Sequence, residues 1–106
     1  MNIQNLLQMG QQVQSQLTQV QETLARQEIS ASSGGGMISA VVDGKGELKR
    51  ITIDPTVVDS KDVEMLEDLI QAAISEAQTR ARGLYEAEMK KVTGGLSLPI
   101  KLPGFP

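Results

Sequence analysis

The chain has 106 residues, a formal net charge of −3, and neither cysteine nor histidine. Zinc, haem and iron–sulfur sites depend on those two side chains, so we expect no metal and no cofactor, and no cysteine or histidine catalysis. One tyrosine and one phenylalanine cannot form the stacking surface of single-strand nucleic-acid binders, and we expect neither a secretory signal nor a membrane span.

Residues 2–26 predict one amphipathic helix. Its apolar residues, with Gly10 filling one gap, recur at alternating steps of three and four, which is the spacing of a heptad seam. Most other positions are glutamine, which favours helix without adding charge. Such a narrow seam favours contact with another helix, in a second copy or in the same chain, over packing on a broad globular face. We expect a homodimer seam made of Leu6, Val13, Leu17, Val20 and Leu24.

Residues 27–54 predict three short antiparallel strands in a meander. The apolar period changes to two, and the glycine-containing stretches 34–36 and 43–46 supply the two turns. The first stretch lacks the frame of a phosphate-binding loop and does not open a helix, so a hairpin turn is the better interpretation. The third strand changes phase partway, which predicts a β-bulge near Lys49 and Arg50.

Residues 60–93 predict a long second helix that Asp59 or Ser60 can cap. With about 32 helical residues at 1.5 Å each, the helix is roughly 48 Å long, whereas a compact chain of this size has a radius of gyration near ~13 Å. Part of the helix must therefore project or be covered by a partner. Residues 96–106 have three prolines and no period, and predict a flexible tail after a single domain of residues 1–95.

Charge is unevenly distributed along the second half of the chain. Residues 54–76 carry seven acidic residues and one lysine, whereas residues 80–91 carry four basic residues and two acidic ones. This pattern is typical either of dipole matching with solvated ion pairs, or of a basic end that contacts phosphates. Glu67 and Asp68 point about 100° apart on a helix, so we expect no acid–base pair and no enzyme. The candidate DNA contacts are Arg80, Arg82, Lys90 and Lys91, followed by Lys49 and Arg50.

Four blocks of sequence occur in order: residues 33–38 (SGGGMI), 43–55 (DGKGELKRITIDP), 64–70 (EMLEDLI) and 93–96 (TGGL). Their order and intervals closely resemble the YbaB/EbfC family of bacterial nucleoid-associated proteins, over nearly the whole chain. The resemblance implies an α+β fold, with an α-β-β-β-α protomer, a three-stranded antiparallel meander between two long helices, and a tight homodimer with projecting helices. It also implies a cytoplasmic protein of the nucleoid that binds double-stranded DNA with little sequence preference.

We therefore expect a homodimer that binds duplex DNA mainly through backbone phosphates and acts in nucleoid organisation and gene regulation. The acidic balance and the uncharged first helix predict weak, salt-sensitive binding. The four basic residues of the second helix lie outside the matched blocks. Their assignment as DNA contacts is therefore inferred from their charge and not from the resemblance. The alternative is a module that binds another protein through the acidic helix face, without relevant DNA contact. Neither a membrane nor a small-molecule substrate is an expected partner.

Overall fold

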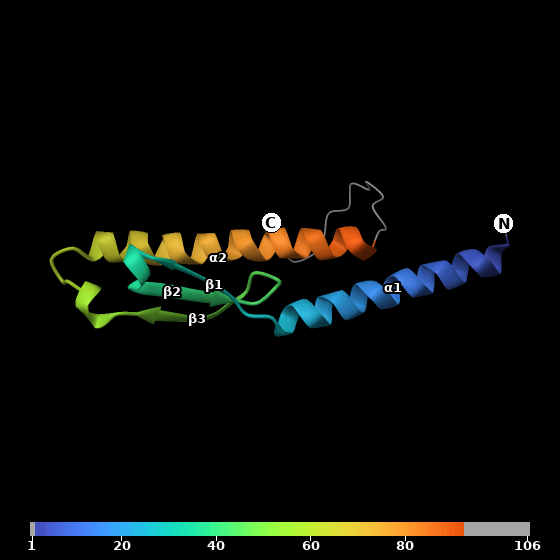
Figure 1. The fold of residues 1–106 in the computed structure, drawn as a ribbon, viewed down its shortest axis with the longest axis horizontal. Coiled ribbons are helices and arrows are strands. Elements are labelled where there is room, and N and C mark those ends of the chain that lie inside the picture. The colour runs from blue at the N-terminus through green and yellow to red at the C-terminus, as the bar shows by residue number, and fades with distance from the viewer. Residues whose placement is uncertain (1, 93–106) are drawn as a thin grey trace.

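A computed structural model describes residues 2–92, which form a helix, three strands and a second helix (Figure 1). The elements are α1 (Ile3–Arg26), β1 (Ile29–Ser33), β2 (Ile38–Val42), β3 (Leu48–Ile53) and α2 (Val63–Val92), with 3₁₀ turns η1 (Gly34–Gly36) and η2 (Pro55–Val57). The α+β class and the α-β-β-β-α order are confirmed. The predicted last residue of the second helix, residue 93, and the predicted tail of residues 96–106 lie outside the described residues.

The three strands form one antiparallel sheet in the order β1-β2-β3, joined by the two predicted turns. The three glycines of η1 have φ between 60° and 93°, a region that side chains with a Cβ rarely adopt. Val41 pairs with Arg50 and Val42 with Leu48, which leaves Lys49 as the extra residue of a β-bulge. The bulge lies where the phase change in the sequence predicted it, and it restores the alternation of β3.

The N-terminal part of α2 covers one face of the sheet (Figure 1). Ala73, Ala77 and Ala81 recur every four residues, and all three are fully buried against the strands. Their small side chains let the helix approach the sheet closely, because nothing beyond Cβ has to be accommodated. The sheet contributes Ala31, Ile38, Ala40 and Val42 to the same core.

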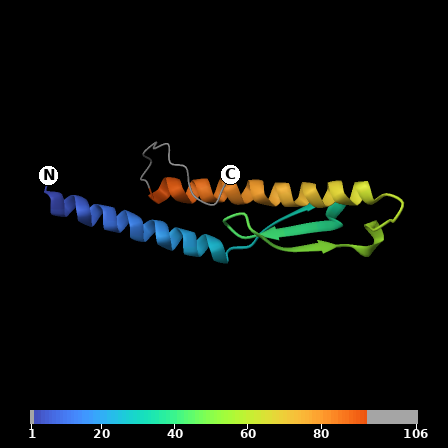
Figure 2. The same ribbon diagram turned by 180° about the vertical axis from the view of Figure 1, so that it is seen from behind.

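The helix α1 leaves the sheet, runs beside the C-terminal half of α2 and projects past it (Figures 1 and 2). Leu24 is buried at its C-terminal end, and Leu17 and Val20 are half-buried with it against Tyr85 and Met89 of α2. The molecule measures 69 × 23 × 17 Å, with a radius of gyration of 18.8 Å. The protomer is therefore far from spherical. The element that extends furthest is α1 rather than the second helix, whose C-terminal part packs against α1 of the same chain.

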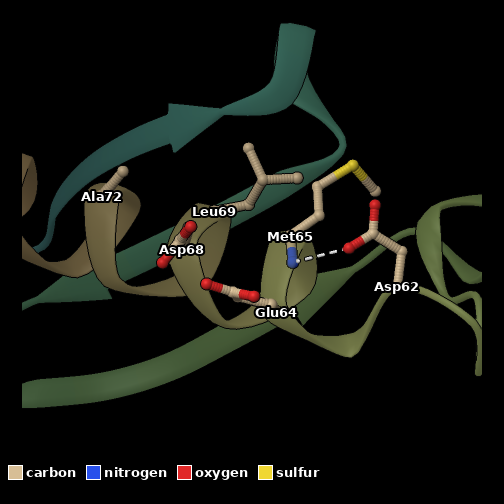
Figure 3. Close-up of a pocket in the computed structure, with 6 residues that line it drawn as sticks. All are labelled: Asp62, Glu64, Met65, Asp68, Leu69 and Ala72. Carbon is tan, nitrogen blue, oxygen red and sulfur yellow. Dashed lines mark hydrogen bonds between the residues drawn. The ribbon is translucent and has the colours of Figure 1, made fainter.

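The start of α2 differs from the sequence prediction. Asp62 caps the helix, since its Oδ1 accepts a hydrogen bond from the Met65 amide at 3.2 Å (Figure 3). Asp59 instead closes the preceding turn by accepting from the Lys61 amide at 2.9 Å. The helix begins at Val63 rather than at residue 60, and neither Asp59 nor Ser60 is its cap. Three residues with capping side chains lie within four positions here, and local backbone geometry selects among them.

Candidate nucleic-acid interface

Arg80 is anchored across the edge of the sheet. Its Nη1 donates to the backbone oxygen of Ser30 at 2.8 Å, and its Nε lies 3.3 Å from a carboxylate oxygen of Glu76. Ser30 belongs to the edge strand β1, so the guanidinium satisfies a carbonyl that the sheet leaves open. The side chain still has 56% of its surface exposed. Arg80 therefore contributes to the fold and can also reach a phosphate.

The four basic residues of α2 spread around its exposed half rather than forming one stripe. At about 100° per residue, Arg80 and Lys91 lie within about 20° of each other around the axis. Lys90 follows about 80° away from Arg80, and Arg82 about 80° beyond Lys90. Glu86 is four residues from both Arg82 and Lys90 and so interrupts this surface. Lys90 is the central residue, and DNA that contacts it can reach either flank.

Lys91 forms an ion pair with Glu88, in which its Nζ lies 3.1 Å from Oε1. The lysine side chain is 73% exposed, so this pair is solvated and contributes little to stability. A phosphate can replace the carboxylate at small cost, because both charges remain in water. The contact therefore leaves Lys91 available to DNA.

Arg50 lies beside the β3 bulge and pairs with Glu28 in the linker between α1 and β1. The hydrogen bond from Arg50 and its positive charge hold the pKa of Glu28 below its ordinary value. Ser30, Val41 and Arg50 form one row across the three strands, so Arg50 and the Arg80 contact lie at opposite sheet edges. With strands about 4.8 Å apart, the two edges are about 10 Å apart at the backbone. The structure thus places Arg50 and the backbone contact of Arg80 at the two ends of one row across the sheet, which their separation in sequence did not indicate.

The opposite end of the molecule is acidic. Asp62, Glu64 and Asp68 line a shallow depression at the start of α2, together with Met65, Leu69 and Ala72 (Figure 3). Just before α2, the backbone and hydroxyl of Thr56 donate to Asp54 and lower the pKa of that carboxyl. Within residues 2–92, no group of three or more acidic side chains is arranged to hold a metal ion. Because these carboxylates repel phosphate, this end is a poor surface for DNA.

The N-terminal half of α1 is uncovered in the protomer, since every residue from 2 to 16 is exposed. Leu6 and Val13 of the predicted seam keep 51% and 45% of their surface, whereas Leu24 keeps 1%. The predicted seam is therefore divided. Its C-terminal part packs within the chain, so that Leu24 has almost no surface left for a partner to bury, whereas Leu6 and Val13 are uncovered in the protomer. Neither described helix has a stretch long and apolar enough to cross a bilayer.

Sequence reasoning missed two apolar residues of this arm, Leu7 and Met9, which are 62% and 56% exposed. They flank the heptad seam rather than continuing it, and so widen the apolar surface of α1. The sequence did contain a signal for them: Leu7 and Met9 are apolar residues close to Gly10 that the alternating steps of three and four do not include.

Comparison with known proteins gives concordant results. The sequence model of the YbaB/EbfC DNA-binding family matches residues 1–96. A nucleoid-associated protein of Gemmatimonas aurantiaca is 48% identical over 91 residues, which cover 86% of this chain and 88% of the relative. A nucleoid-associated protein of Paramagnetospirillum magneticum is 48% identical over 104 residues, or 98% of this chain and 94% of the relative. The crystal structure of an uncharacterized protein from Helicobacter pylori has the same fold, with a TM-score of 0.81, 21% identity, and coverage of 89% and 99%.

Proposed function

Because the chain belongs to the YbaB/EbfC DNA-binding family, we propose that it is a nucleoid-associated protein that binds double-stranded DNA as a homodimer. Binding is mainly to backbone phosphates, has little sequence preference, and serves nucleoid organisation and gene regulation in the cytoplasm. The observation that carries this proposal is that the sequence model of the family matches residues 1–96. Relatives named as nucleoid-associated proteins are 48% identical to this chain. The geometry of the protomer supports the two finer parts, the dimer and the contact to phosphates.

The uncovered arm of α1 supports a homodimer. The part of α1 that extends past α2 exposes apolar surface at Ile3, Leu6 and Val13. Exposure of such surface to water is unfavourable in free energy. A second copy supplies an identical seam, which can cover this one symmetrically. Contact along a heptad seam needs another helix, and the protomer's own α2 already uses its apolar residues against the C-terminal part of α1.

The side chains present support contact to phosphates rather than base readout. Tyr85 is buried, so within residues 2–92 no aromatic ring is available to stack on a base. Most of the exposed basic residues among residues 2–92 lie on the C-terminal half of α2 and at the β3 edge, away from the acidic start of α2; the others are Arg26 at the end of α1 and Lys61 just before α2. A twofold dimer doubles this surface, which compensates for the small number of positive charges on each chain.

The direct test is titration of the full-length protein into labelled duplexes of several unrelated sequences at a series of salt concentrations. Counterion release predicts that the logarithm of the binding constant falls linearly with the logarithm of salt, with similar slopes for all duplexes. A slope near zero, or binding confined to one sequence, would overturn the phosphate mechanism. A protein partner that stays bound at high salt, without any DNA shift, would favour the acidic depression at Asp62, Glu64 and Asp68 as the functional surface instead.

A further inference from the structure

We infer that the turn between β2 and β3, residues 43–47, fixes the direction in which α1 projects. The turn lies where α1 leaves the sheet (Figures 1 and 2). It contacts the C-terminal end of α1 on one side and the middle of α2 on the other. This inference concerns the protomer itself and holds whether or not the arms contact DNA.

The contact with α1 requires glycine at position 44. The Gly44 amide donates to the backbone oxygen of Leu24 at 2.7 Å, and the same oxygen accepts from Gln27 at 3.1 Å. One of the last carbonyls of α1, which has no partner inside the helix, is satisfied in this way. A Cβ on Gly44 would lie 2.5 Å from that oxygen and 2.8 Å from the Leu24 Cα and Cβ, closer than any real contact. Only glycine lets the turn reach the helix end.

Asp43 holds the turn in the conformation that presents Gly44. Its side chain is buried, and its Oδ1 accepts from the amides of Lys45 at 2.8 Å and Glu47 at 3.0 Å. Its own amide donates to the Glu47 oxygen, and its carbonyl accepts from Gly46. Four hydrogen bonds thus close five residues into a rigid unit, and the two that involve the side chain disappear in Asp43→Ala.

The other side of the turn is tied to α2. The Gln78 side-chain amide donates to the Gly46 oxygen at 3.1 Å. Seven residues further along the same face, Tyr85 packs against Leu24 itself. The end of α1 is therefore held at two points, by the hydrogen bond from Gly44 and by the contact of Leu24 with α2.

A small displacement at this junction is amplified along the arm. Clearing the clash in Gly44→Ala requires a shift of about 1 Å, since non-bonded heavy atoms settle near 3.5 Å apart. If the helix pivots at Leu17, which is about 10 Å from Leu24 along the axis, Gln4 lies about 20 Å beyond the pivot. The same tilt then moves Gln4 by about 2 Å.

The test is a distance measurement between spin labels on the two helices. The chain has no cysteine, so cysteines introduced at Gln4 and Ala87 carry the only labels. Mixing with excess unlabelled protein leaves one labelled chain per dimer, and omitting DNA separates this result from the proposed function. Circular dichroism confirms that each variant is folded.

We expect Gly44→Ala to shift the mean distance by about 2 Å or to broaden its distribution. Asp43→Ala broadens it too, whereas Asp43→Asn, which keeps an oxygen acceptor, restores the parental distribution. Gly83→Ala is the matched control, because a Cβ there meets nothing within 4 Å. If Gly44→Ala does not fold, the Asp43 pair decides. Parental distances in every folded variant of Gly44 and Asp43 would overturn the inference.

Discussion

Replacing Lys90 and Lys91 together by alanine tests whether the C-terminal half of α2 contacts DNA. Lys90 is central among the basic residues of α2, and Lys91 makes only a solvated pair with Glu88. In a twofold dimer the double variant removes up to four phosphate contacts. Each contributes about 0.9 to the slope of log K against log salt, so the slope falls by up to about 3.6. The protein fold should be nearly unaffected, because the interactions of exposed lysine side chains on a helix surface contribute about 0–1 kcal/mol each.

The magnitude is large enough for an ordinary fluorescence anisotropy titration. A fourfold rise in salt concentration lowers the binding constant about 3.5-fold for each phosphate contact, and therefore about 150-fold for four contacts. The parent should lose that much more affinity than the variant over this range, on every duplex tested.

Arg80→Ala with Arg82→Ala is the matched comparison, because it removes the same charge from the same helix. This variant also loses the hydrogen bond from Arg80 to Ser30 and the pair with Glu76, so we expect it to be less stable by about 1 kcal/mol. Phosphate contact by α2 is refuted if both double variants keep the parental slope. It is refuted equally if affinity is lost for one sequence only, since backbone contacts carry no direct base information.

Three further outcomes follow from the structure. Val13→Asp should leave the protomer folded, because Val13 is 45% exposed there, but it places a charge in the proposed dimer seam. Sedimentation should therefore show a monomer, and an intact dimer would mean that the seam lies elsewhere. The lowered pKa of Glu28 means that its ionised form stabilises the fold above the ordinary glutamate pKa of about 4.3, and that this contribution is lost as pH falls through the lowered value. Arg50→Met should therefore reduce the loss of melting temperature between pH 6 and pH 3, and an unchanged loss would contradict this. Ala77→Leu should cost about 1–3 kcal/mol in chemical unfolding, whereas Ala87→Leu on the exposed face should cost little; equal effects would contradict the close approach of α2 to the sheet.

The elements themselves could be predicted from local pattern. Steps of three and four indicated α1, a period of two indicated the strands, and a change of phase located the bulge at Lys49. These features depend on which side chains share a face within a few residues, and that information is contiguous in the sequence. The family was also recognisable from its glycine turns, because their order and spacing are properties of the chain.

The candidate site was predicted less completely. Their charge identified Arg80 and Arg50 as candidate DNA contacts. It did not indicate their protein partners, Ser30 and Glu28, which lie 50 and 22 positions away in the sequence. Both pairings arise because antiparallel strands and the packing of α2 bring distant segments together. Which basic groups already have a protein partner is therefore a tertiary property.

The heptad seam of α1 shows the same division most clearly. Ile3 and Leu24 are three heptads apart and occupy equivalent places in one repeating pattern, yet one is 72% exposed and the other 1%. The sequence by itself determined that α1 would have an apolar stripe, since periodicity sets which residues share a face. Only the tertiary structure decided how much of that stripe the chain covers itself, because burial depends on where α2 and the turn at Gly44 lie beside it.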